Sequence, residues 1–145
     1  MKKIISVFVF LFILSIQCLA ETIVKTTSVQ EIKNLMQTEG YTVEINKDGD
    51  ISWKIDGTKT ILYIISEGQG LSFFVAYNTT KVSLGDINDF NKNYLYSRSF
   101  LNDKGNPCLK SDLSLDGGIT NQRLLSYFHN CKRLLSLFEK KIFKL

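Results

Sequence analysis

Alternation of apolar and polar residues between positions 41 and 77 constrains the fold of this chain more than any other feature. Successive side chains of a β-strand point to opposite faces, so a period of two indicates strands that bury one face. Short turns rich in Gly and Asp separate the segments, and strands joined by tight turns must lie antiparallel. The four segments lie at 41–46, 51–55, 61–65 and 71–77. We therefore predict an antiparallel meander, in which the apolar run 61–65 is a central strand buried on both faces.

Three further segments have the signals of helices. Ser28 and Glu31 form a capping box, in which each side chain accepts from the backbone of the other, and they predict a helix over 29–39. Ser83 and Asp86 begin a second, shorter helix in the same way. Thr120 caps the last helix, whose apolar face covers about five turns. That face consists of Leu124, Phe128, Cys131, Leu135, Phe138 and Ile142.

A second hairpin is predicted between the last two helices, with strands at 95–101 and 109–115 and with Pro107 where the second strand begins. No internal repeat or low-complexity linker interrupts the order of elements, which indicates one domain. The fold class that we expect is α+β, with a twisted antiparallel sheet of five or six strands flanked by three helices.

Several residues in the second half of the chain resemble the YbjN family of bacterial proteins, and the resemblance extends over roughly 29–140. They are Ile87, Asn88, Asn91, Arg98, Asp112, Leu113, Gly117 and Gly118, with the acidic-Gly turn of the hairpin between them. Phe90 stands where the family usually carries Trp. The resemblance implies the fold of type III secretion chaperones, and it implies a homodimer because chaperones of this fold pair through strands and helices. The family has been labelled as sensory-transduction regulators, a label that implies no reaction.

The first twenty residues predict a secretory signal peptide. A basic start precedes an apolar run at 4–14, and small residues lead to a cleavage site after Ala20. The run is too short to span a membrane as a helix, which takes roughly 20 apolar residues. Cleavage would leave residues 21–145 as a single periplasmic or secreted domain. Two alternatives stay open: a lipoprotein acylated at Cys18, and an uncleaved anchor.

Cys108 and Cys131 would be the only cysteines of the cleaved chain, and an exported pair favours a disulfide. A strand that leaves Cys108 and a helix that returns to Cys131 could bring the two sulfurs to one end of the sheet. Strand alternation, however, turns Cys108 away from the face that Leu109 and Leu113 share. Both a disulfide and two separate thiols, with Cys131 in the core, therefore remain open.

Four polar residues form the most informative polar set: Asn88, Asn91, Arg98 and Asp112. The resemblance places them where the second helix meets the hairpin. They could hold the helix to the sheet, or they could form a polar patch that reads a ligand. The single histidine, His129, has no motif of a metal site or catalytic triad beside it, so we predict no catalytic residues, no metal and no cofactor.

Aromatic residues are frequent in the predicted strands, and their alternation places most of them in the core. They are Trp53, Tyr63, Phe73, Phe74, Tyr94, Tyr96 and Phe100. An open sheet nevertheless leaves one face uncovered somewhere, and an aromatic face of this kind suits a peptide or a partner segment.

The basic and apolar tail at 132–145 has three interpretations: a helix packed on the core, a dimer contact, or contact with a membrane surface. Removing residues 1–20 also halves the net charge of +4, and such a balance does not call for a nucleic-acid partner. The sequence therefore predicts an exported, non-enzymatic module that binds a protein or peptide, chaperone-like or regulatory. The alternatives are an enzyme with an unrecognised site and a membrane-surface protein that acts through its last helix.

Overall fold

The computed structural model describes residues 22–79 and 81–144 and confirms the α+β fold. The predicted signal peptide, residues 1–20, lies outside the described residues, as does its cleavage site after Ala20. The described part contains three α-helices: α2 at Val29–Thr38, α3 at Leu84–Asn93 and α4 at Asn121–Phe143. Each begins after its predicted capping residue, because the side chains of Ser28, Ser83 and Thr120 accept a backbone N–H three residues later.

Six strands form one antiparallel sheet in the order β2-β3-β4-β5-β7-β6. They are β2 at Val43–Ile45, β3 at Ile51–Ile55, β4 at Thr58–Ile65, β5 at Gly70–Ala76, β6 at Arg98–Leu101 and β7 at Pro107–Ser114. The first four follow one another as the predicted meander. The second hairpin joins through β7, which pairs with β5 and leaves β6 at the edge.

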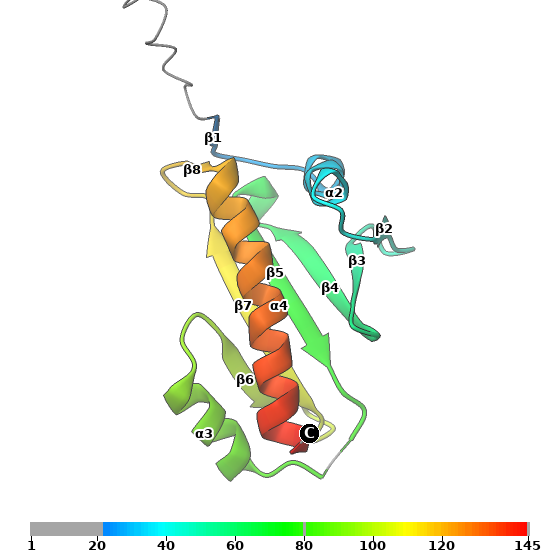
Figure 1. Ribbon diagram of the computed structural model, residues 1–145, viewed down its shortest axis with the longest axis vertical. Coiled ribbons are helices and arrows are strands. Elements are labelled where there is room, and N and C mark those ends of the chain that lie inside the picture. Colours follow the sequence, from blue (N-terminus) through cyan, green and yellow to red (C-terminus); the bar gives the residue numbers. More distant parts are fainter. Residues whose placement is uncertain (1–21, 80, 145) are drawn as a thin grey trace, which may run out of the picture.

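Helix α4 runs across one face of the sheet, with α2 and α3 on the same side near its two ends (Figure 1). Its 23 residues make it about 34 Å long. The ring of Phe128 meets that of Trp53 on β3, and the ring of Phe138 meets that of Phe90 on α3, with centroids 6.3 and 5.1 Å apart. Because all four side chains are buried and both contacts are edge-to-face, they join the sheet, α3 and α4 in one core.

The prediction that β4 is buried on both faces is wrong. Leu62 is fully buried against the core, whereas Ile61, Tyr63 and Ile65 on the other face are only half-buried. The reason is that all three helices of the described chain pack on the face that carries Leu62. An apolar run therefore marked a central strand correctly but did not show that one of its faces is open.

Two short strands were not predicted from the sequence. They are β1 at Ile23–Val24 and β8 at Ile119–Thr120, and they pair with each other. Gly118 permits this close approach, since a Cβ there would lie 2.5 Å from Cγ2 of Ile23. A second contact follows at the short 3-10 helix η1, Ser66–Gly68, where Thr27 N donates to Gly68 O over 2.8 Å. The N-terminal lead-in is thus held to the domain at two places.

The basic C-terminal tail packs on the core through its apolar side chains. Leu134, which lies outside the main apolar stripe, is fully buried, and Leu137 is half-buried. The ring of Phe143 contacts that of Tyr77 at a centroid distance of 4.8 Å. The apolar width of α4 is therefore used by the domain itself, and the lysines lie on its exposed side.

Candidate functional site

One face of the sheet is covered by no helix of the described residues, and we call it the open face. Its centre is apolar: the half-buried side chains of Ile61, Tyr63, Ile65 and Phe74 lie on the neighbouring strands β4 and β5. The rings of Tyr63 and Phe74 are 6.3 Å apart. Burial, with smaller contributions from Asp50 and Asp48, raises the pKa of Tyr63, so its phenol stays neutral at physiological pH.

Cations flank this apolar centre on both sides. Lys54 lies directly opposite Lys59 in the β3–β4 pair, and Arg98 lies directly opposite Lys110 in the β6–β7 pair. Like charges at directly opposed positions destabilise a sheet. The two pairs therefore leave positive charge on both sides of the apolar centre, partly offset by Asp112, which lies 3.6 Å from Lys110.

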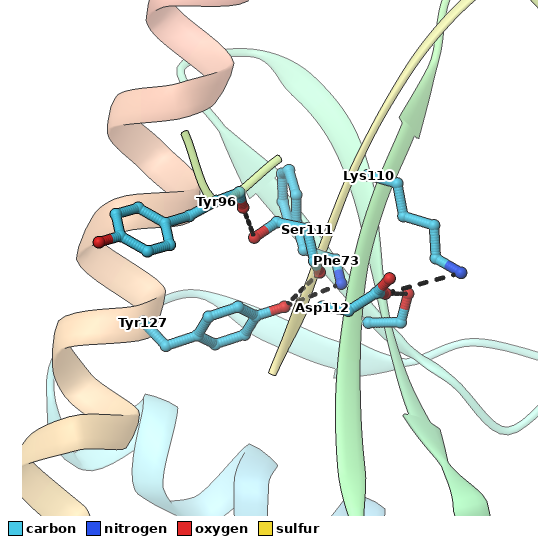
Figure 2. A network of polar contacts seen from close by, with 7 residues as sticks. Phe73, Tyr96, Lys110, Ser111, Asp112 and Tyr127 are labelled. Carbon is cyan, nitrogen blue, oxygen red and sulfur yellow. Dashed lines mark hydrogen bonds and ion pairs between the residues drawn. The ribbon is translucent and has the colours of Figure 1, made fainter. Parts of the chain in front are cut away.

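The face toward α4 is held together by a tyrosine that the sequence analysis did not single out. The Tyr127 hydroxyl accepts from Phe73 N over 3.0 Å and donates to Ser111 O over 2.7 Å, so it joins β5 and β7 where these two residues are paired (Figure 2). Burial raises the pKa of Tyr127 far above its usual value, which keeps the proton available for this bond. The position of Tyr127 beside the apolar stripe of a helix is the sequence feature that indicates this role, since a buried hydroxyl needs a hydrogen-bond partner.

Next to this bridge, the chain leaves the edge of the sheet. Ser111 Oγ donates to Tyr96 O over 2.8 Å, and Tyr96 has a positive φ of 64° that turns the backbone away from β7. The prediction of a strand over 95–101 was too long for this reason, and β6 begins only at Arg98. Leu95 and Tyr96 are left 71% and 75% exposed, beside a groove of about 540 Å³ between β7 and α4.

The structure divides the predicted polar set. Asn91 is structural: its amide donates to Ser99 O over 3.0 Å and accepts from Ser99 N over 2.9 Å, which fixes α3 to β6. Asn88 is exposed on α3 and is not part of this contact. Arg98 and Asp112 instead lie on the open face and both line the groove.

Asp112 is well anchored in this position. Its Oδ1 accepts from Ser72 Oγ over 2.6 Å and lies 3.6 Å from Lys110 Nζ, as Figure 2 shows for the ion pair. Arg98 has its guanidinium carbon 5.9 Å from the centre of the Phe100 ring, a cation–π contact, and its N–H groups make no hydrogen bond to the residues that the structure describes. Of the four predicted residues, these two remain candidates for partner contact.

Cys108 and Cys131 are separate, buried thiols, so the disulfide considered from the sequence is not formed. Cys108 has the parity of Phe100 and Ala76 and points to the open-face side, while Cys131 lies on α4 on the other side of the sheet. Burial raises the pKa of both thiols, that of Cys131 to about 12, which keeps them protonated and poor as nucleophiles.

Over residues 22–79 and 81–144 the structure shows no group of three or more His, Cys, Asp and Glu that could hold a metal ion. No helix in the same part of the chain is long and apolar enough to cross a membrane. His129 is exposed on α4.

Comparison with known proteins identifies the family. The YbjN family, described as "Putative bacterial sensory transduction regulator", matches residues 28–143. The chain belongs to the YbjN family. The match covers the domain from the cap of α2 to the end of α4, so this YbjN domain contains the open face and the groove. A comparison with curated proteins gives no match.

Two solved structures share the fold of this YbjN domain. YbjN from E. coli superposes with a TM-score of 0.65 at 13% identity, covering 81% of this chain and 91% of that one. The type III secretion chaperone SycH of Yersinia pestis, solved in complex with a stable fragment of YscM2, superposes with a TM-score of 0.52 at 21% identity. That alignment covers 79% of this chain and 97% of SycH. The chaperone-like fold implied by the family resemblance is thereby confirmed.

Proposed function

We propose that this YbjN protein is an exported, non-enzymatic module that binds a partner protein through the open face of its sheet. The observation that carries the proposal is the apolar centre of Ile61, Tyr63, Ile65 and Phe74, which is half-exposed because α2, α3 and α4 lie on the other side of the sheet. Burying such a centre against a partner removes apolar surface from water, which contributes about 25 cal/mol for each Å² before the entropic costs of association are subtracted.

Two comparisons support a protein partner. The family is described in terms of regulation, and SycH, which shares the fold, was solved with a bound protein fragment. The cation pairs of the open face favour a partner that carries acidic residues beside apolar ones. They disfavour a second copy of this chain in the same place, because a two-fold axis there would bring the lysines and arginines toward copies of themselves.

Export rests on the sequence of residues 1–20, and the periplasm or the extracellular medium is the proposed location. The two buried, protonated thiols are compatible with either place. The non-enzymatic character is supported by the kind of surface described above, which is apolar and cationic and is not built around an activated nucleophile.

Photo-crosslinking in cells tests the function. A benzophenone amino acid replaces Phe74 on the open face or, as a control, Leu84, which is 71% exposed on α3. We expect a crosslink to one defined protein from position 74 only, and we expect the purified pair to bind at least tenfold more weakly after Tyr63→Lys. Crosslinks equal at both positions, or a complex that ignores Tyr63→Lys, would exclude the open face as the binding surface.

A further inference from the structure

Strand β7 has a free edge beside the open face. β6 pairs with β7 only as far as Arg98 opposite Lys110, so residues 111–114 have β5 on one side and no strand of the described chain on the other. These four residues form an edge about 13 Å long at 3.3 Å per residue. A strand edge of this kind is a template for pairing with another segment.

The backbone groups of this edge point outward. Leu115 N donates to Gln69 O over 2.9 Å, which shows that the odd-numbered residues of β7 bond to β5. Alternation in an antiparallel ladder then directs the N–H and C=O groups of Asp112 and Ser114 to the opposite side, into the space that β6 leaves.

The groove follows this edge between β7 and α4. Leu113 and Tyr127 line its helix side, and Arg98 and Lys110 line its open-face side. Ser97 also lines the groove, and its hydroxyl oxygen is buried with no hydrogen-bond partner in the described part of the chain. A buried hydroxyl without a partner costs free energy, which an occupant with backbone amides would recover.

The groove carries more positive than negative charge. Arg98, Lys110 and Arg123 line it together with one carboxylate, Asp112, which already pairs with Lys110 at 3.6 Å. Neither arginine has an ion pair within residues 22–79 and 81–144. An acidic occupant would therefore meet two unpaired guanidinium groups, whereas a second copy of this chain would add like charges.

We propose that the groove binds an extended, acidic segment of the partner, which pairs with residues 111–114 of β7 as an added strand. Alternate side chains of such a strand face opposite sides, so acidic residues meet Arg98 on the open-face side and apolar residues meet Leu113 on the helix side. This inference rests on the proposed protein-binding function and specifies its mode and its chemistry.

Synthetic peptides test the added strand on the purified chain 21–145. The probe is a fluorescein-labelled octapeptide that alternates glutamate and valine, and fluorescence anisotropy measures its binding. We expect the affinity to fall at least tenfold when lysine replaces glutamate, and at least tenfold when the backbone nitrogens of alternate residues are methylated, because a methylated nitrogen cannot donate to β7. Equal binding of the methylated peptide would overturn strand addition.

Variants locate the site. Arg98→Glu should lower the affinity for the probe peptide at least tenfold. Lys140→Glu makes the same charge change at an exposed residue of the last turn of α4, and it should change the affinity by less than twofold. Ser114→Pro removes an outward N–H at a position where an edge strand tolerates proline. It should also lower the affinity for the probe peptide tenfold. Equal losses for Arg98→Glu and Lys140→Glu would show unspecific attraction and overturn the site.

Light scattering on the same samples tests whether a second copy of this chain, and not a partner, occupies the edge of β7. A dimer that Ser114→Pro converts to a monomer would show that a second copy covers the edge, and it would overturn the proposal. Absence of peptide binding while the crosslink from position 74 persists would refute the added strand alone. Loss of both the peptide and the crosslink would refute the protein-binding function as well.

Discussion

The hydroxyl of Tyr127 donates to the carbonyl oxygen of Ser111 over 2.7 Å, and through this bond helix α4 is fastened to the strand that bears the groove. The same hydroxyl accepts from Phe73 N, so one oxygen from the helix satisfies a backbone donor and a backbone acceptor inside the sheet. Tyr127 and Ser111 both line the groove, so this contact joins its two walls.

Tyr127→Phe should lower the free energy of unfolding by about 1–3 kcal/mol, because it removes two buried hydrogen bonds, to Phe73 N and to Ser111 O. Urea denaturation measures the change. Tyr94→Phe is the matched control, since the half-buried ring of Tyr94 stacks on Phe90 at 4.5 Å and its hydroxyl makes no hydrogen bond to a described residue. Equal losses for the two variants would contradict the bridging role.

A second polar contact holds the far end of α4. Glu139 Oε1 accepts from Thr58 Oγ1 and from Tyr77 Oη, each over 2.6 Å, and joins α4 to β4 and to the end of β5. Tyr77→Phe and Glu139→Gln should each destabilise by about 1 kcal/mol, and the double variant should lose less than the sum because the two groups share one bond. A double-mutant cycle in urea measures the coupling, and strict additivity would show that the contact is not energetically coupled.

A position can require glycine because of a positive φ or because a Cβ would clash, and Gly68 and Gly57 distinguish these two reasons. Both have a positive φ, 91° and 93°, but a Cβ at Gly68 would lie 2.5 Å from Thr27 O, whereas at Gly57 nothing lies within 4 Å. Gly57→Ala should therefore cost about 1 kcal/mol for backbone strain alone, and Gly68→Ala should cost more and release the N-terminal lead-in. Limited proteolysis near residue 27 reports that release. Equal costs would mean that the clash is relieved elsewhere.

Two capping carboxylates make part of the stability depend on pH. Hydrogen bonds from the side chain and backbone of Ser28 lower the pKa of Glu31, and those from Ser83 lower the pKa of Asp86. A pKa lowered by folding contributes stability that is present at neutral pH and is lost as the pH falls from the unfolded value, 4.5 for Glu31 and 3.8 for Asp86, through the lower folded value. Glu31→Gln and Asp86→Asn should each reduce the difference between urea midpoints at pH 7 and pH 3, and an unchanged difference would contradict the capping contribution.

The chemistry of the two thiols tests whether Cys108 and Cys131 lie on opposite sides of the sheet. Because Cys108 and Cys131 lie on opposite sides of the sheet, the mass of the denatured chain 21–145 should not change on reduction. Iodoacetamide should label neither buried thiol in the folded protein and both after unfolding in urea. A gain of two daltons on reduction would show a disulfide and contradict the arrangement.

Patterns among neighbouring residues predicted most of the helices and strands. The features that were not predicted depend on contacts between residues far apart in the sequence. The caps at Ser28 and Thr120 and the meander are properties of neighbouring residues, so the sequence displays them directly. The open face is not local: Ile61 and Tyr63 are apolar whether or not a helix covers them. The pairing of β1 with β8 joins residues about a hundred positions apart and has no periodicity to show it.

The candidate site was predicted only in part for the same reason. Arg98 and Asp112 stood out by their resemblance to a family pattern, but the sequence grouped them with Asn91, which fixes α3 to Ser99. The groove exists because the backbone turns away at Tyr96, and a positive φ at a tyrosine has no signal in the sequence.

The placement of α4 also bears on the order of synthesis. A ribosome makes α4 after all six strands of the sheet, yet Tyr127, Phe128 and Phe138 on this helix pack on those strands and on α3. Until those residues emerge, α2 and α3 cover only the ends of that face, and the sheet cannot complete its core. We therefore expect the domain to complete its fold only after α4 has been made, and an incompletely folded chain is the form that the proposed export through a membrane pore requires.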